Sequence, residues 1–95
     1  ALRAVSASGG AWNAVSDEDI LATMGILGRS EGVFGEPAGV TASAGVMKAV
    51  QQGIIKPNET VTTISTGSGL KDVKNALRAA GRPHKCAPSI EGLPA

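Results

Sequence analysis

Thr66 is the side chain of this sequence best placed to contact a ligand. It follows the β-branched run Thr60–Ser65, and a turn that contains two glycines leads from it into a helical pattern. Open α/β sheets bind ligands at such strand-to-helix turns, and glycine lets the backbone approach a ligand closely. The same pattern also fits a plain turn at the end of a strand. The candidate ligand-contact residues are Thr66, Gly67, Ser68 and Gly69.

Two charged residues could be taken for catalytic groups, but we expect other roles for both. Lys71 is followed by Asp72 in the first turn of a helix. A solvated or ion-paired lysine is expected there, rather than the desolvated amine that forms Schiff bases. Glu36 precedes Pro37, where a carboxylate can cap its own helix, and a single carboxylate does not make a cation site. We therefore assign no catalytic residue.

The cysteine content argues against a metal site and an internal disulfide. Cys86 is the only cysteine, and His84 lies two residues before it. Two possible ligands are too few for a structural zinc site. A single cysteine is typical of a reducing compartment. We expect no bound metal and a cytoplasmic location.

Charge and hydropathy exclude several classes of protein. The 95 residues include 9 basic and 8 acidic side chains, with no run of like sign. A nucleic-acid-binding protein would need a basic face. The apolar stretches are far shorter than the ~20 residues that a membrane-spanning helix requires. The N-terminal residues contain no hydrophobic signal-peptide core.

Capping signals predict three helices. Ser16 with Asp19 forms a variant capping box, and the helix that it begins should be stopped by Gly28 and then by Glu31-Gly32. A second helix should run from Pro37 to about Gln52, and its apolar or small residues on every side predict burial all round. A third should follow the glycine turn and end at Ala80.

The segments between these helices suggest an α/β fold. Thr60–Ser65 is the clearest predicted strand, and residues 11–15 are a weaker second one. Residues 83–95 contain three prolines and should be extended coil. A strand that feeds directly into a helix favours an α/β layer architecture, here part of a three-layer helix–sheet–helix sandwich.

The small side chains suggest that residues 1–95 are a single segment of a larger protein. Trp12 and Phe34 are the only aromatic residues, and there are 13 glycines. Aromatic side chains supply much of the buried area of a small core, whereas glycine adds to the entropy lost on folding. The alternative is a tight independent domain.

Four motifs resemble the C-terminal part of the threonine synthase family. They are SDEDIL at 16–21, EGVFGEPAG at 31–39, IIKPNETVTTISTGSGLKD at 54–72 and PSIEGL at 88–93. The TG-x-GLKD run is the most specific, whereas EPAG is shared with related dehydratases. The resemblance implies a fold-type II enzyme that depends on pyridoxal 5'-phosphate (PLP) and is similar to tryptophan synthase β. This chain would be the C-terminal part of its PLP-binding domain.

The resemblance also implies roles for the glycine turn. Thr66 would share a hydrogen bond with the pyridine nitrogen of PLP, and Gly67 and Gly69 would leave room for the ring. A hydroxyl there cannot stabilise a pyridinium, so the cofactor would be a weaker electron sink. The Schiff-base lysine and the phosphate-binding loop would come from earlier segments. The complete enzyme, a homodimer, would convert O-phosphohomoserine and water to threonine and phosphate, and the isolated chain would be inactive.

Two departures from the family pattern leave alternatives open. Gly35 replaces a small or aliphatic residue before EPAG, and Ser68 replaces the more common Asn or His. A paralogous dehydratase that acts on another hydroxy amino acid would look much the same. A non-catalytic interaction or anion-binding module that retained the fold is the alternative from another class, and its apolar second helix would be the interface.

Overall fold

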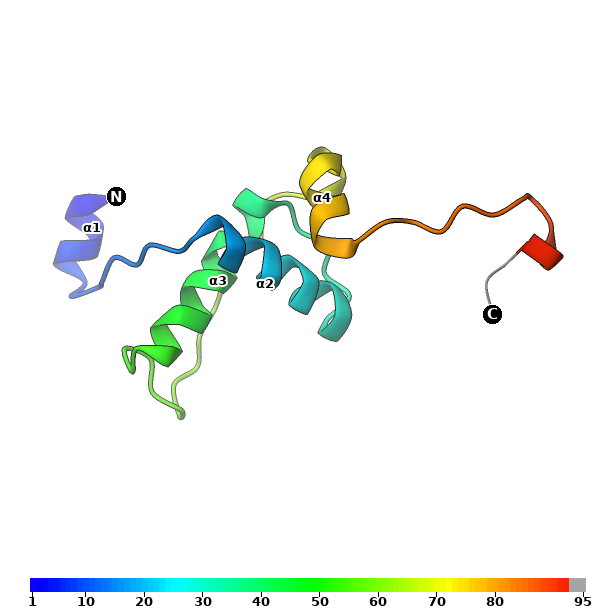
Figure 1. The fold of residues 1–95 in the computed structure, drawn as a ribbon. Helices are drawn as coiled ribbons and strands as arrows, with labels where there is room; N and C mark the ends of the chain where they lie inside the picture. Colours follow the sequence, from blue (N-terminus) through cyan, green and yellow to red (C-terminus); the bar gives the residue numbers. More distant parts are fainter. Residues whose placement is uncertain (93–95) are drawn as a thin grey trace.

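The computed structural model describes residues 1–92. Within these residues, four α-helices follow one another (Figure 1): α1 (Leu2–Ala7), α2 (Asp17–Ser30), α3 (Pro37–Gln51) and α4 (Val73–Ala80). Two short 3-10 helices, η1 (Gly69–Lys71) and η2 (Ile90–Gly92), lie before α4 and near the C-terminus. No sequence signal predicted α1, which has no side-chain cap.

Helix α2 begins as predicted, continues through Gly28 and ends at the second predicted stop, Glu31-Gly32. The Ser16 hydroxyl accepts a hydrogen bond from the Asp19 backbone N–H at 3.1 Å, and the Asp19 carboxylate accepts from the Ser16 N–H at 3.3 Å. This reciprocal pair is a complete capping box. Gly28 does not stop the helix, which ends at Ser30 just before Gly32, whose φ is +67°. A single glycine inside a helix costs only about 1 kcal/mol, so packing of the surrounding turns outweighs it.

Helices α3 and α4 have the predicted bounds to within a residue or two. Pro37 occupies the first turn of α3, and Gly53, with φ +71°, follows its end. Gly81, with φ +86°, follows the end of α4. The prediction that α3 is buried all round is wrong. One face is buried, but Met47 and Val50 remain exposed.

The predicted sheet is not formed by residues 1–92. Residues 60–65 and 11–15 are both outside regular secondary structure, and the one β-bridge joins Gly35 to Ser68 in antiparallel orientation. A strand needs a neighbour to satisfy its backbone groups, and residues 1–92 place no strand beside residues 60–65. These residues therefore do not show a three-layer sandwich. Residues 83–89 are irregular, as predicted, whereas 93–95 lie outside the described part of the chain.

The buried core is small and lies where α2 packs against α3 and α4. Its apolar members are Met24, Val40, Ala44, Ala49 and Ala76. Helix α1 and the C-terminal segment extend away from this core on opposite sides (Figure 1). The radius of gyration is 17.1 Å, against about 12 Å for a compact chain of this length. Many large apolar side chains are left exposed as a result, including Leu2, Trp12, Ile64, Leu70 and Ile90.

Among residues 1–92, no helix combines the length and the apolar character that crossing a membrane would require.

Candidate functional site

The glycine turn is attached to the start of α3 by two backbone hydrogen bonds. The Glu36 N–H donates to the Gly67 carbonyl at 2.9 Å, and the Gly69 N–H donates to the Phe34 carbonyl at 2.9 Å. These bonds flank the bridge between Gly35 and Ser68. The turn that the sequence predicted as the site is therefore fixed against the EPAG segment, more than thirty residues earlier in the chain.

Contacts within the chain explain why positions 67 and 69 are glycines. A Cβ atom at Gly67 would overlap the carboxylate of Glu36, and one at Gly69 would lie 2.6 Å from the Phe34 ring. Gly39, in the first turns of α3, is restricted in the same way, because its Cβ would lie 2.8 Å from the Gly67 nitrogen. Neither Gly67 nor Gly69 has a positive φ, so the requirement is for space. The proposed clearance for a cofactor ring stays a prediction.

The two hydroxyls of the turn differ in what they contact. Thr66 is exposed, and its hydroxyl takes part in none of the hydrogen bonds found within residues 1–92. The Ser68 hydroxyl accepts from the Leu70 N–H at 3.3 Å and so caps η1. Thr66 therefore keeps both its donor and its acceptor capacity for a ligand.

Glu36 and Lys71 form an ion pair beside the turn. The Lys71 Nζ lies 3.1 Å from Glu36 Oε1, and the two side chains are 66% and 17% exposed. Glu36 occupies the N-cap position of α3, but its carboxylate makes no capping hydrogen bond, so the expectation that it caps its helix is wrong. The expectation that Lys71 is ion-paired is confirmed, with Glu36 as the partner.

Asp72 and Phe34 contribute to the site, although neither was predicted from the sequence to have a role there. The Asp72 carboxylate accepts from the Asn75 N–H at 3.1 Å and from the Asn75 side-chain amide at 2.8 Å, which begins α4 directly after η1. Hydrogen bonds from the Asn75 side chain, and then from its backbone, lower the pKa of Asp72 below its ordinary value of 3.8. An aspartate directly before an amphipathic run was the available signal. No comparable local signal exists for the Phe34 ring over Gly69.

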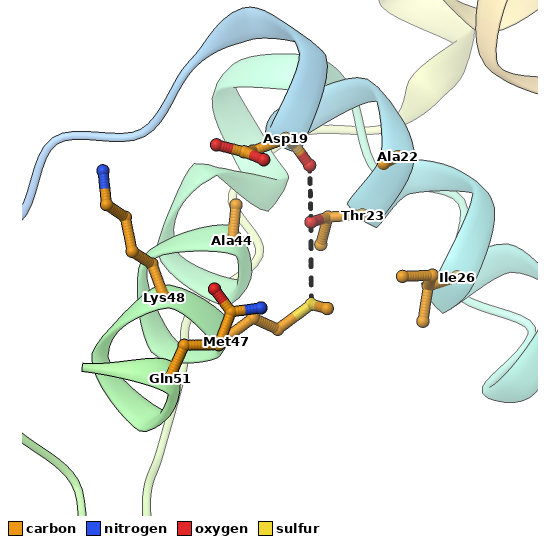
Figure 2. Close-up of a pocket in the computed structure, with 8 residues that line it drawn as sticks. All are labelled: Asp19, Ala22, Thr23, Ile26, Ala44, Met47, Lys48 and Gln51. Atoms are coloured by element: carbon orange, nitrogen blue, oxygen red, sulfur yellow. Dashed lines mark hydrogen bonds between the residues drawn. The ribbon is translucent and has the colours of Figure 1, made fainter. Parts of the chain in front are cut away.

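A separate cavity of about 150 Å³ lies between α2 and α3 (Figure 2). The buried Thr23 hydroxyl donates to the Asp19 carbonyl at 2.7 Å and contacts the Met47 sulfur at 3.7 Å, so it already has partners. Hydrogen bonds from the Ser16 side chain and backbone lower the pKa of the nearby Asp19. Lys48, also on this cavity, donates to the Ala14 carbonyl at 2.6 Å. Asp19, Thr23 and Lys48 are thus all engaged in hydrogen bonds within the chain, and the cavity is a packing feature of the helix pair.

Possible metal ligands are not clustered in the part of the chain that the structure describes. Residues 1–92 contain no group of three or more His, Cys, Asp or Glu side chains that could hold an ion. Cys86 is exposed and has a free thiol.

Several known proteins that are similar to this chain carry the name threonine synthase. The chain is 45% identical over 85 residues to the threonine synthase of Methanocaldococcus jannaschii. The aligned residues make up 90% of this chain and 21% of that protein. It is 47% identical over 77 residues to the threonine synthase of Bacillus sp. (strain ULM1), covering 81% of this chain and 22% of that protein. It is 40% identical over 94 residues to that of Mycobacterium tuberculosis (strain H37Rv), covering 99% of this chain and 24% of that protein. No protein-family model matches the chain.

These matches identify the family from which the segment comes. The chain belongs to the threonine synthase family, and it corresponds to a C-terminal segment of such proteins. It spans only about a fifth to a quarter of the length of the relatives that it matches.

Proposed function

We propose that this chain forms one wall of the cofactor site of a threonine synthase-type enzyme. The complete enzyme would convert O-phosphohomoserine and water to threonine and phosphate, using PLP. The similarity to proteins named threonine synthase supports the reaction class. The observation that carries the local role is the position of Thr66. It is exposed, directly precedes a turn fixed by two backbone hydrogen bonds, and has no hydrogen-bond partner for its hydroxyl within residues 1–92.

The groups present at the turn suit a neutral pyridine nitrogen. When bound, PLP withdraws electrons from the substrate carbon that carries the amino group. The Thr66 hydroxyl can donate a hydrogen bond to an unprotonated ring nitrogen, whereas a carboxylate in its place would favour the protonated ring. Glu36, the carboxylate in contact with Gly67, is already paired with Lys71. Thr66 would therefore orient the ring without protonating it, with Ser68 as a neighbouring hydroxyl.

Lys71 is not proposed as the Schiff-base lysine. Its side chain is 66% exposed and ion-paired, and neither property suits a lysine that must lose its proton to react. We propose that the reactive lysine and the phosphate-binding loop come from other segments of the enzyme. This chain would then contribute binding and orientation of the cofactor ring.

The exposed apolar surface supports a role as part of a larger protein. Within residues 1–92, five apolar residues are buried, whereas fourteen large hydrophobic side chains are exposed. Exposed apolar surface of this extent is typical of a surface that another part of a protein covers. We propose that the N-terminal remainder of the enzyme covers it and supplies strands beside residues 60–65. That arrangement would complete the three-layer sandwich in a cytoplasmic, homodimeric enzyme.

The proposal can be tested with and without the residues encoded upstream of Ala1. The longer protein should bind PLP and release phosphate from O-phosphohomoserine. Thr66→Val should weaken PLP binding by about three- to tenfold, the value of one hydrogen bond, whereas Thr66→Ser should restore it. Equal PLP affinity in all three proteins would overturn the role of Thr66.

A second measurement addresses the chain alone. We expect that borohydride reduction of the PLP-treated 95-residue chain, followed by mass measurement, yields no stoichiometric adduct on Lys71. A stoichiometric adduct there would contradict the proposal. A stable, monodisperse 95-residue protein, together with a longer protein that binds no PLP, would favour the non-catalytic module instead.

A further inference from the structure

We propose that Glu36 and Lys71 are positioning residues that set the orientation of Thr66 by fixing the glycine turn between them. This inference rests on the proposed function for the part that concerns the cofactor. The effect on the turn itself can be measured without any cofactor. Neither residue is proposed to touch PLP.

The contacts of Glu36 connect both sides of the turn. Its N–H donates to the Gly67 carbonyl at 2.9 Å, and its carboxylate packs into the space that a side chain at Gly67 would occupy. The same carboxylate reaches Lys71 at 3.1 Å, beyond the turn and at the end of η1. One side chain thus contacts the chain directly after Thr66 and again five residues after it.

The position of the carboxylate indicates that this arrangement is not an ordinary helix cap. Glu36 is the N-cap residue of α3, yet its side chain accepts no hydrogen bond from the helix backbone. A capping side chain would instead accept from an N–H in the first turn. The side chain is only 17% exposed, so its charge needs a partner, and Lys71 supplies one. The partial positive charge of the helix N-terminus favours a carboxylate at this place as well.

The Lys71 side chain adds a further link between η1 and the EPAG segment. Backbone hydrogen bonds tie Gly67 and Gly69 to the EPAG segment, but Lys71 is attached to it only through its side chain. Without the ion pair, the Glu36 carboxylate would lose its counter-charge and move toward water. The space beside Gly67 would then open, and the backbone that carries Thr66 would gain freedom.

Amide hydrogen exchange in the longer protein, prepared without PLP, tests the effect on the turn. Gly69 reports directly, because its N–H donates to the Phe34 carbonyl. Glu36→Gln and Lys71→Met should each speed exchange at Gly69 by about two- to fivefold, the range expected for a partly exposed ion pair. The double variant should resemble the single ones, and Lys71→Arg should restore the wild-type rate. Lys74→Met, which neutralises an exposed lysine outside the pair, is the matched control.

Salt provides an independent check. Raising NaCl to about 1 M shortens the screening length to about 3 Å, so it should speed exchange at Gly69 in the wild type and leave Lys71→Met unchanged. Unchanged exchange in both single variants would overturn the proposal. So would an equal effect of Lys74→Met. If Glu36→Gln loses its helical circular dichroism, the comparison of Lys71→Met with Lys71→Arg decides the outcome, because this position is largely exposed.

The effect on the cofactor is read out in the longer protein with ¹⁵N-labelled pyridoxine 5'-phosphate, which cannot form a Schiff base. Its ring-nitrogen chemical shift should change in Thr66→Val, and it should change in the same direction in Glu36→Gln and Lys71→Met. A response to Thr66→Val alone would overturn the positioning role and leave the proposed function intact. No response to Thr66→Val would overturn the proposed contact, while the exchange data would still decide whether the ion pair fixes the turn.

Discussion

The carboxylate of Glu36 lies where the Cβ atom of any residue other than glycine at position 67 would be. This relationship joins two motifs that are separated by thirty residues in the sequence, EPAG and TG-x-GLKD. It also explains, by a contact within the protein, why the second motif has glycine at position 67. The absent side chain at Gly67 makes room for Glu36, and Glu36 in turn binds Lys71.

Gly67→Ala should destabilise the protein. The new methyl group would displace the Glu36 carboxylate and break its ion pair, at a cost of roughly 1–3 kcal/mol, as for overpacking elsewhere in proteins. Urea unfolding followed by circular dichroism measures this cost. Because the clash is with Glu36, the same substitution should cost less in a Glu36→Ala background. Equal costs in the two backgrounds would contradict the contact.

Alanine substitutions at two glycines of α3 should have opposite effects on stability. At Gly39 a Cβ would lie 2.8 Å from the Gly67 nitrogen, a backbone atom that cannot easily move, so Gly39→Ala should cost roughly 1–3 kcal/mol. At Gly45 no heavy atom lies within 4 Å, so Gly45→Ala should stabilise the helix by roughly 0.5–1 kcal/mol through backbone entropy. Thermal unfolding of the two variants provides the comparison. A stabilising Gly39→Ala would show that the turn does not approach α3 as described.

Ser16→Ala should weaken the start of α2. The substitution removes the hydroxyl that accepts from the Asp19 N–H, and loss of such a cap costs about 1 kcal/mol. Ser16→Thr should retain most of the stability and serves as the control. Helical circular dichroism during urea unfolding measures both variants. An unchanged midpoint in Ser16→Ala would mean that the capping box contributes nothing to stability.

Acid should remove the stabilisation contributed by two caps. Hydrogen bonds from Ser16 lower the pKa of Asp19, and those from Asn75 lower the pKa of Asp72. A carboxylate with a lowered pKa stabilises the fold above its ordinary value of 3.8, and this stabilisation is lost as the pH falls through the lowered pKa. Helical content should therefore decrease below about pH 4, and it should decrease less steeply in the double variant Asp19→Asn/Asp72→Asn.

Titration of the Asp19 carboxyl by NMR gives a sharper readout, because Ser16→Ala should raise the pKa of Asp19 toward 3.8. A titration that Ser16→Ala leaves unchanged would contradict the stated cause.

Local signals predicted the helices well because the forces that begin and end a helix act within a few residues. Ser16 with Asp19 and Pro37 marked the starts of α2 and α3, and Gly53 and Gly81 followed the ends of α3 and α4. Of the two predicted stops of α2, Glu31-Gly32 ends the helix and Gly28 does not, because one glycine costs less than the surrounding turns gain by packing. The strand at residues 60–65 could not be judged from its residues alone, because a strand is stable only beside another strand.

The sequence by itself determined the family, the boundaries of helices α2, α3 and α4, and the turn that carries Thr66. The sequence motifs and the helix caps are properties of short segments, so they can be recognised without knowing what packs against those segments. Only the tertiary structure decided that Glu36 fills the space beside Gly67 and binds Lys71, and that Phe34 covers Gly69. These contacts join residues more than thirty positions apart, and they exist only because two backbone hydrogen bonds bring the EPAG segment against the glycine turn.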